Sequence, residues 1–164
     1  MRIELINLDK YVISENPIIL DDYSSGSYAV YYAINKNEKT FLCFMPDEER
    51  GFEPRCDYLM LGNEDNTIRF IELKGVDSTV EKKCCPSIWA HAFHQLIATY
   101  EAYEYLIDFE NDIMKMILCT SANKIRLHDK KRSATRFEQY KYYKKIRENR
   151  IIPQILYCNE EDVV

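Results

Sequence analysis

The apolar residues of the chain fall into short runs whose spacing predicts strands and a smaller number of helices. Residues 55–75 contain two β-prone apolar runs joined by the polar residues 62–66, which is the pattern of a β-hairpin. Both faces of this hairpin are apolar, so it belongs in the middle of a sheet that is covered on both sides. Further strands are predicted at residues 28–34, 40–45, 114–120 and 151–158.

Helices are predicted on either side of the strand at residues 114–120. Residues 88–100 carry no charged side chain apart from two histidines, which favours a largely buried helix, capped by Ser87 and extending to about residue 107. A second helix is predicted from Ser133 to residue 149. The amino-terminal pattern is less regular: it suggests a strand or edge hairpin at residues 3–12 and a short helix at residues 18–23.

This order of elements predicts an α/β fold with a mixed central β-sheet flanked by helices. A chain of 164 residues fits one domain, residues 1–164, with its core at about residues 38–158. A hydrophobic content of 46% with 30% charged residues excludes a disordered chain. No apolar run approaches the roughly 20 residues of a membrane span. The first ten residues lack a secretory signal pattern. We therefore expect a cytoplasmic protein with no membrane partner.

Three ionisable residues, Asp57, Glu72 and Lys74, interrupt the apolar pattern of the hairpin. If Asp57 faces Glu72, the numbers of each opposed pair sum to 129 and the midpoint falls inside the predicted turn. Because side chains alternate between faces, Lys74 lies on the same face as Glu72. The hairpin thus brings two carboxylates and an ammonium together at one end. The alternative is an ordinary salt bridge between Glu72 and Lys74 at a partly exposed strand end.

Two carboxylates held close together at an apolar edge repel each other unless a cation lies between them. Mg²⁺ suits such a site, and Mn²⁺ is the alternative, because Mg²⁺ binds a few carboxylate oxygens and keeps several waters. An ammonium beside the ion can hold the attacking water and stabilise charge on a phosphate. These residue types therefore indicate metal-assisted hydrolysis of a phosphodiester.

Asp57 followed by Glu72-Leu73-Lys74 at the end of the next apolar strand resembles the Asp…Glu-x-Lys signature of the PD-(D/E)xK nucleases. The tripeptide alone is unspecific; the two strands, the following Gly75 and the apolar helix give it weight. The resemblance implies a restriction-endonuclease-like core over residues 38–158. It also implies metal binding by Asp57, Glu72 and the main-chain carbonyl of Leu73, with Lys74 positioning the water.

Gln95, on the helix after the Glu-x-Lys strand, resembles the glutamine of RecB-type nucleases, although the spacing to the following tyrosine is looser here. The resemblance implies that Gln95 orients the region of Glu72 and Lys74 or contacts a phosphate. The alternative is a satisfied core amide. His91 and His94 lie on the same helix, and capping or surface roles are expected for them rather than catalysis.

Related nucleases often supply one more acidic residue from the amino-terminal region. Glu15, Asp21 and Asp22 are candidates, and Glu53, in the acidic loop four residues before Asp57, is a separate one; a solvated loop acid is the alternative for each. The six cysteines form no Cys-x-x-Cys pair, and four of them lie in apolar strand-like runs, so a zinc or iron–sulfur site is not expected. Cys84 and Cys85 are placed in a loop.

The basic residues are concentrated in residues 124–150, which contain eleven Lys or Arg and three acids, a net charge of +8 in a chain of net charge −5. Such a segment can bind a polyanion locally; the alternative is an ordinary solvated helix. The candidate nucleic-acid-binding residues are Lys130, Lys131, Arg132, Arg136, Lys141, Lys144 and Lys145.

The leading hypothesis is a Mg²⁺- or Mn²⁺-dependent nuclease acting on nucleic acid, with DNA favoured and RNA left open. Some double-strand cutters work as homodimers, so a homodimer is one option. The alternative function is a non-catalytic regulatory module on the same fold that binds nucleic acid or protein.

Overall fold

The computed structural model describes residues 10–21, 29–46, 54–75, 81–121, 144–157 and 160–164, with only the backbone described at residues 81–90. In chain order, its elements are β1 (Lys10–Ile13), β2 (Ile18–Asp21), β3 (Val30–Ile34), β4 (Phe41–Phe44), β5 (Tyr58–Gly62), β6 (Thr67–Lys74), α1 (Glu81–Tyr103), the 3₁₀ helix η4 (Glu104–Leu106), β7 (Ile113–Thr120), β8 (Ile152–Leu156) and β9 (Asp162–Val163). A short helical segment at residues 144–148 precedes β8.

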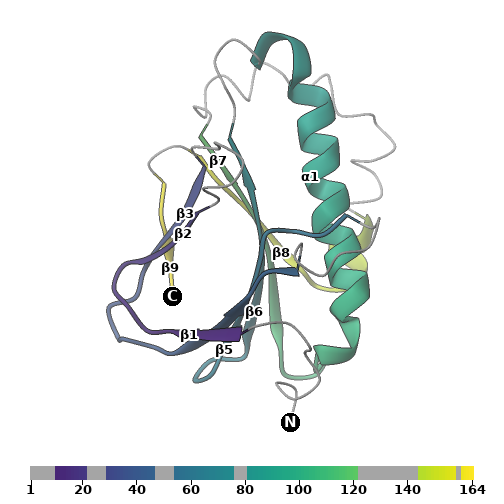
Figure 1. Cartoon of the computed structure of the whole chain (residues 1–164). Coiled ribbons are helices and arrows are strands. Elements are labelled where there is room, and N and C mark those ends of the chain that lie inside the picture. The colour runs from purple at the N-terminus through teal and green to yellow at the C-terminus, as the bar shows by residue number, and fades with distance from the viewer. Residues whose placement is uncertain (1–9, 22–28, 47–53, 76–80, 122–143, 158–159) are drawn as a thin grey trace.

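The strands form two sheets. Six of them make a mixed sheet in the order β1-β4-β5-β6-β7-β8, which is antiparallel up to β6 and parallel from β6 to β8. The other three make a smaller sheet in the order β2-β3-β9. Figure 1 shows α1 along one face of the large sheet and the small sheet on the opposite side. The protein is thus an α/β structure with a mixed central sheet.

The β5–β6 hairpin lies at the centre of the large sheet, as the sequence predicts. Tyr58 pairs with Ile71 and Leu61 with Ile68, which is the register whose pair numbers sum to 129. The turn needs glycine at position 62, because a side-chain Cβ there would collide with the carboxyl of Asp65.

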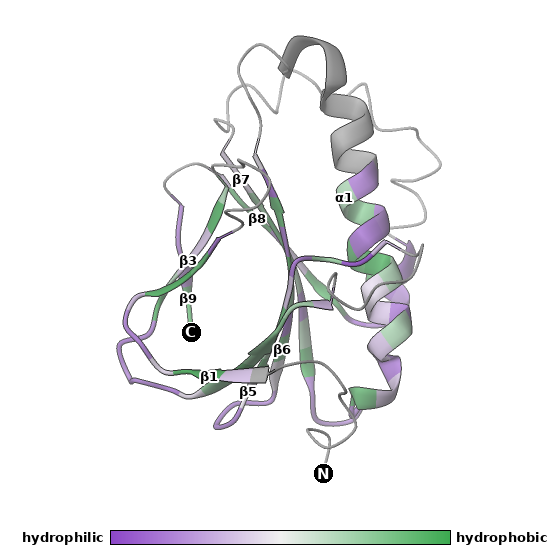
Figure 2. Ribbon diagram, viewed as in Figure 1, coloured by the Kyte–Doolittle hydropathy of each residue, from purple (hydrophilic) through white to green (hydrophobic). Residues whose placement is uncertain are grey.

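The two faces of this hairpin belong to two separate hydrophobic clusters, and Figure 2 shows the hydrophobic positions along the central strands. Leu59 and Phe70 are on the α1 side, where the rings of Phe70 and Tyr100 have centroids 5.9 Å apart. Tyr58 and Ile71 are on the side of the small sheet. The prediction of a sheet covered on both sides is confirmed, because alternating residues of the same strands are buried against different layers.

Several predicted elements differ from the observed ones. Residues 18–21 form strand β2 rather than the start of a helix, because Ile18 and Leu20 pair with β3 and are buried. Helix α1 begins at Glu81, so Ser87 does not cap it and Cys84 and Cys85 lie in the helix, not in a loop. Among the described residues, the second face of the large sheet is covered by strands and not by a helix.

The core also extends beyond residues 38–158 at both ends of the chain. Tyr31 is fully buried, and Val164 packs in the cluster between the two sheets. Within the part of the chain that is described, no helix is long and apolar enough to cross a membrane.

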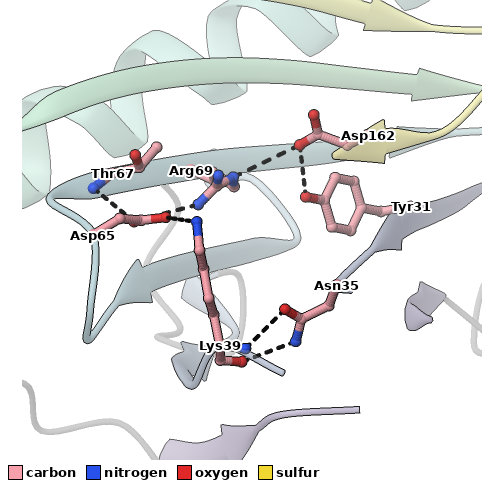
Figure 3. Close-up of polar contacts among 7 residues, drawn as sticks. All are labelled: Tyr31, Asn35, Lys39, Asp65, Thr67, Arg69 and Asp162. Atoms are coloured by element: carbon pink, nitrogen blue, oxygen red, sulfur yellow. Dashed lines mark hydrogen bonds and ion pairs between the residues drawn. The ribbon is translucent and has the colours of Figure 1, made fainter. Parts of the chain in front are cut away.

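A buried ionic network ties the two sheets together (Figure 3). Arg69 of β6 has its Nε 3.6 Å from Asp162 Oδ2 of β9, and the hydroxyl of Tyr31 in β3 donates to the same oxygen at 2.8 Å. On the other side, the guanidinium lies 3.9 Å from Asp65, whose carboxylate is also 3.5 Å from Lys39 Nζ. Because an unpaired buried charge is strongly unfavourable, these contacts bind the carboxy-terminal strand to the centre of the large sheet.

Candidate metal and phosphodiester site

The site lies where β5 begins and β6 ends. Asp57 immediately precedes Tyr58, the first residue of β5. Because Tyr58 pairs with Ile71, Asp57 lies opposite the next residue of β6, Glu72. Side chains of directly opposed residues point to the same face of a sheet, so both carboxylates face helix α1. The hairpin therefore produces the juxtaposition that the sequence pattern predicts.

Glu72 is fully buried, which is unusual for a carboxylate. The pKa of Glu72 is raised to about 8, first by burial and then by the negative charge of Asp57, while Lys74 and a hydrogen bond from the Asp57 backbone oppose these effects without cancelling them. A buried carboxylate beside a second carboxylate is an environment that a cation would relieve.

Lys74 supplies one positive charge to the site. Its Nζ lies 2.6 Å from Glu72 Oε1, and its side chain is 19% exposed. The residue is at the last position of β6. The salt bridge of the alternative interpretation is present, but it joins a buried acid to a partly exposed base and is not a surface pair.

Asp57 is held by the backbone of the opposite strand. Its Oδ2 accepts a hydrogen bond from the Leu73 N–H at 2.7 Å. The N–H and C=O of one strand residue point to the same side, so the Leu73 carbonyl is also directed toward the β5 side of β6. Two carboxylates and a main-chain carbonyl are hard oxygen donors, and such a set fits Mg²⁺ or Mn²⁺ better than Zn²⁺.

Helix α1 fixes the segment that leads into Asp57. The Gln95 side-chain amide donates to the Arg55 carbonyl at 3.0 Å, while its buried Oε1 has no hydrogen-bond partner among the residues that the structure describes. One turn later, the Thr99 hydroxyl accepts from the Cys56 N–H at 2.7 Å. The hydrogen bond of Gln95 thus goes to the strand that carries Asp57 rather than to Glu72 or Lys74.

Two side chains near the site were not among the residues selected from the sequence. His91 is exposed on α1, and its pKa is lowered by partial burial and by the positive charge of Lys74. Thr120 is buried at the end of β7, next to Lys74 in the parallel β6–β7 register. The spacing of four between His91 and Gln95 indicates a shared helix face, but the sequence favoured a capping or surface role for His91. Thr120 has no such local signal, because only strand pairing brings it to Lys74.

The proposed additional acids do not join this site where they are described. Glu15 is exposed, and its carboxylate accepts a hydrogen bond from the Ser14 N–H. Asp21 ends β2 in the small sheet, on the opposite side of the large sheet from Glu72, and its carbonyl accepts a hydrogen bond from the Tyr58 hydroxyl. Asp22 and Glu53 lie outside the described residues.

No group of three or more His, Cys, Asp or Glu side chains suited to a metal occurs in the described parts of the chain. The two carboxylates leave most of an ion's coordination to other donors, as Mg²⁺ sites often do. Cys43, Cys56 and Cys119 are buried free thiols, and burial raises the pKa of each of them, so they act as small apolar side chains.

The basic segment is described only from residue 144 onward. Lys144 lies 3.8 Å from Glu148, and Lys145 lies 3.5 Å from Glu101 with its ammonium 5.5 Å from the centre of the Tyr100 ring. Both lysines thus have acidic partners on the protein. The other candidate nucleic-acid-binding residues, Lys130, Lys131, Arg132, Arg136 and Lys141, lie outside the described residues.

Comparisons of the chain with protein-family models, curated proteins and solved structures found no match.

Proposed function

We propose that the protein is a metal-dependent nuclease with a restriction-endonuclease-like core, and that it hydrolyses phosphodiester bonds of DNA or RNA. The observation that supports this best is the fully buried Glu72, opposite Asp57 and 2.6 Å from Lys74. Burying two neighbouring carboxylates in an apolar layer lowers the stability of the fold, and a divalent cation between them would offset their repulsion.

In this proposal, Asp57, Glu72 and the Leu73 carbonyl hold Mg²⁺ or Mn²⁺. A divalent ion bound there would polarise a phosphate oxygen and make a bound water easier to deprotonate. Lys74 holds the attacking water and stabilises negative charge that grows on the phosphate. Gln95 positions the Asp57 strand through the Arg55 carbonyl. The basic residues at 124–150 contact the phosphate backbone outside the site, in a salt-dependent manner.

The test is cleavage of labelled DNA and RNA by the purified protein, with and without Mg²⁺ or Mn²⁺. We expect cleavage only with the ion, and a loss of at least about a hundredfold in rate for Asp57→Asn and for Lys74→Met. Lys39→Met is the matched control, because it removes a partly exposed lysine that also has a carboxylate partner, Asp65, but lies at the turn end of the hairpin, away from the site. Cleavage that survives both site substitutions, or its absence from the wild type, would overturn the proposal.

Calorimetry with Mn²⁺ separates metal binding from turnover. We expect the wild type to bind the ion, Glu72→Gln to bind it much more weakly and Lys74→Met to retain it, because the lysine is not a ligand. Binding of the ion without cleavage of either nucleic acid would favour the non-catalytic module instead.

A further inference from the structure

Helix α1 holds the segment that precedes β5. Thr99 accepts from the Cys56 N–H, and Gln95, one turn earlier, donates to the Arg55 carbonyl. Both groups belong to the same peptide unit, so two successive turns of α1 hold it. His91 is one more turn toward the start of α1, about 6 Å beyond Gln95 along the helix axis, at a rise of 1.5 Å per residue.

The packing of α1 on β6 places His91 beside the end of that strand. Because α1 connects the parallel strands β6 and β7, it runs back along β6 from the end of the strand. The rings of Phe70 and Tyr100 have centroids 5.9 Å apart. Lys74 lies about 13 Å past Phe70 along the strand and His91 about 13.5 Å before Tyr100 along the helix, so His91 is near the level of Lys74. The lowered pKa of His91, due to partial burial and then to the charge of Lys74, agrees with this position.

We propose that His91 contacts the nucleic-acid phosphate that lies beside Lys74, donating an imidazole N–H to one of its oxygens; this inference rests on the proposed nuclease function. An exposed ring at the mouth of the site can reach a bound strand, whereas Glu72 and Thr120 are buried. A neutral imidazole adds a hydrogen-bond donor without placing a second positive charge next to Lys74. His91 is thereby assigned to substrate binding, and not to the metal.

His94 provides a matched control on the same helix. It is also exposed, but it lies at the level of Gln95 and is turned about 100° from it around the helix axis. It should therefore not reach a phosphate that lies beyond Lys74. His91→Ala and His94→Ala are equivalent changes at two exposed helix positions, and both remove the side-chain donor, so a general effect on α1 would be seen in both.

Steady-state cleavage of an oligonucleotide with Mn²⁺ is the first test. We expect His91→Ala to raise KM by about 3- to 10-fold, the loss of one hydrogen bond, with a smaller change in kcat. His94→Ala should match the wild type, and Mn²⁺ affinity should be unchanged in both. Equal KM values for wild type and His91→Ala would overturn the inference and leave the nuclease proposal standing.

Histidine NMR tests binding without requiring cleavage, because the chain contains three histidines and single variants assign their signals. A short oligonucleotide added with Ca²⁺ should shift the His91 ring signals and leave those of His94 in place. If the wild type does not cut but His91 still shifts, the inference holds and only turnover fails. An unshifted His91 in a protein that binds the oligonucleotide would refute it.

Discussion

Glu72→Gln in the metal-free protein tests the electrostatic account of the site. The pKa of Glu72 is raised from an ordinary value of 4.5 to about 8, mainly by burial. A glutamate whose folded-state pKa is raised keeps its proton in the folded protein at pH values where the unfolded chain has lost it. The unfolded state therefore binds fewer protons, and stability falls as pH rises between about 4.5 and 8.

The size of the effect follows from these two pKa values. Each pKa unit corresponds to about 1.4 kcal/mol, so ionisation of Glu72 weakens the fold by on the order of 5 kcal/mol above pH 8. That is a large part of the 5–15 kcal/mol typical of a domain. Glutamine carries no ionisable proton, so Glu72→Gln should lack this part of the pH dependence. The variant should gain stability relative to the wild type as pH rises, and the difference should level off above about pH 8.

The assay is urea unfolding of both proteins in EDTA, from about pH 5 to about pH 9. Glu148→Gln is the control, because that side chain is 57% exposed and its change should leave the pH dependence as it is. Adding Mn²⁺ at a hundredfold excess over Kd should stabilise the wild type by about 2.7 kcal/mol and the Glu72→Gln protein far less. Parallel pH curves for wild type and Glu72→Gln would refute the reasoning, because Glu72 would then ionise as freely in the folded protein as in the unfolded chain.

Two further predictions concern contacts that hold the site in place. Asp162→Asn should lower the free energy of unfolding by about 3 kcal/mol or more, because it leaves the buried Arg69 without its partner in β9. As a control, Lys144→Ala at an exposed position should change the free energy of unfolding by less than about 0.5 kcal/mol. Thr99→Val should cost about 1–3 kcal/mol, because the Cys56 N–H loses its acceptor, and hydrogen exchange at that amide should accelerate. An unprotected Cys56 amide in the wild type would contradict the last prediction.

The hairpin and its three charged residues could be predicted from local sequence. Alternation with a period of two assigns each side chain to a face, and the short polar turn leaves few registers, so the Asp57–Glu72 opposition follows from residue numbers alone. The burial of one face of α1, which includes Ala92, Leu96 and Tyr100, also follows from the apolar composition of that helix. Local sequence does not specify how deeply Glu72 is buried, because that depends on α1 and β7 packing over it.

Other features depended on contacts between distant parts of the chain. Residues 18–21 are a strand because β3 pairs with them, which overrides a pattern that also fits a helical turn. Arg69 is buried because Asp162, far along the sequence, neutralises it from a strand of only two residues. His91 and Thr120 join the site through the position of α1 on the hairpin and the parallel pairing of β7.

The sequence by itself determined the chemistry of the candidate site, because the types and spacing of Asp57, Glu72 and Lys74 are local properties of two adjoining strands. Only the tertiary structure decided their electrostatic environment and their neighbours. Desolvation and the field of nearby charges depend on every layer packed around a group, and these layers come from segments that no local pattern connects.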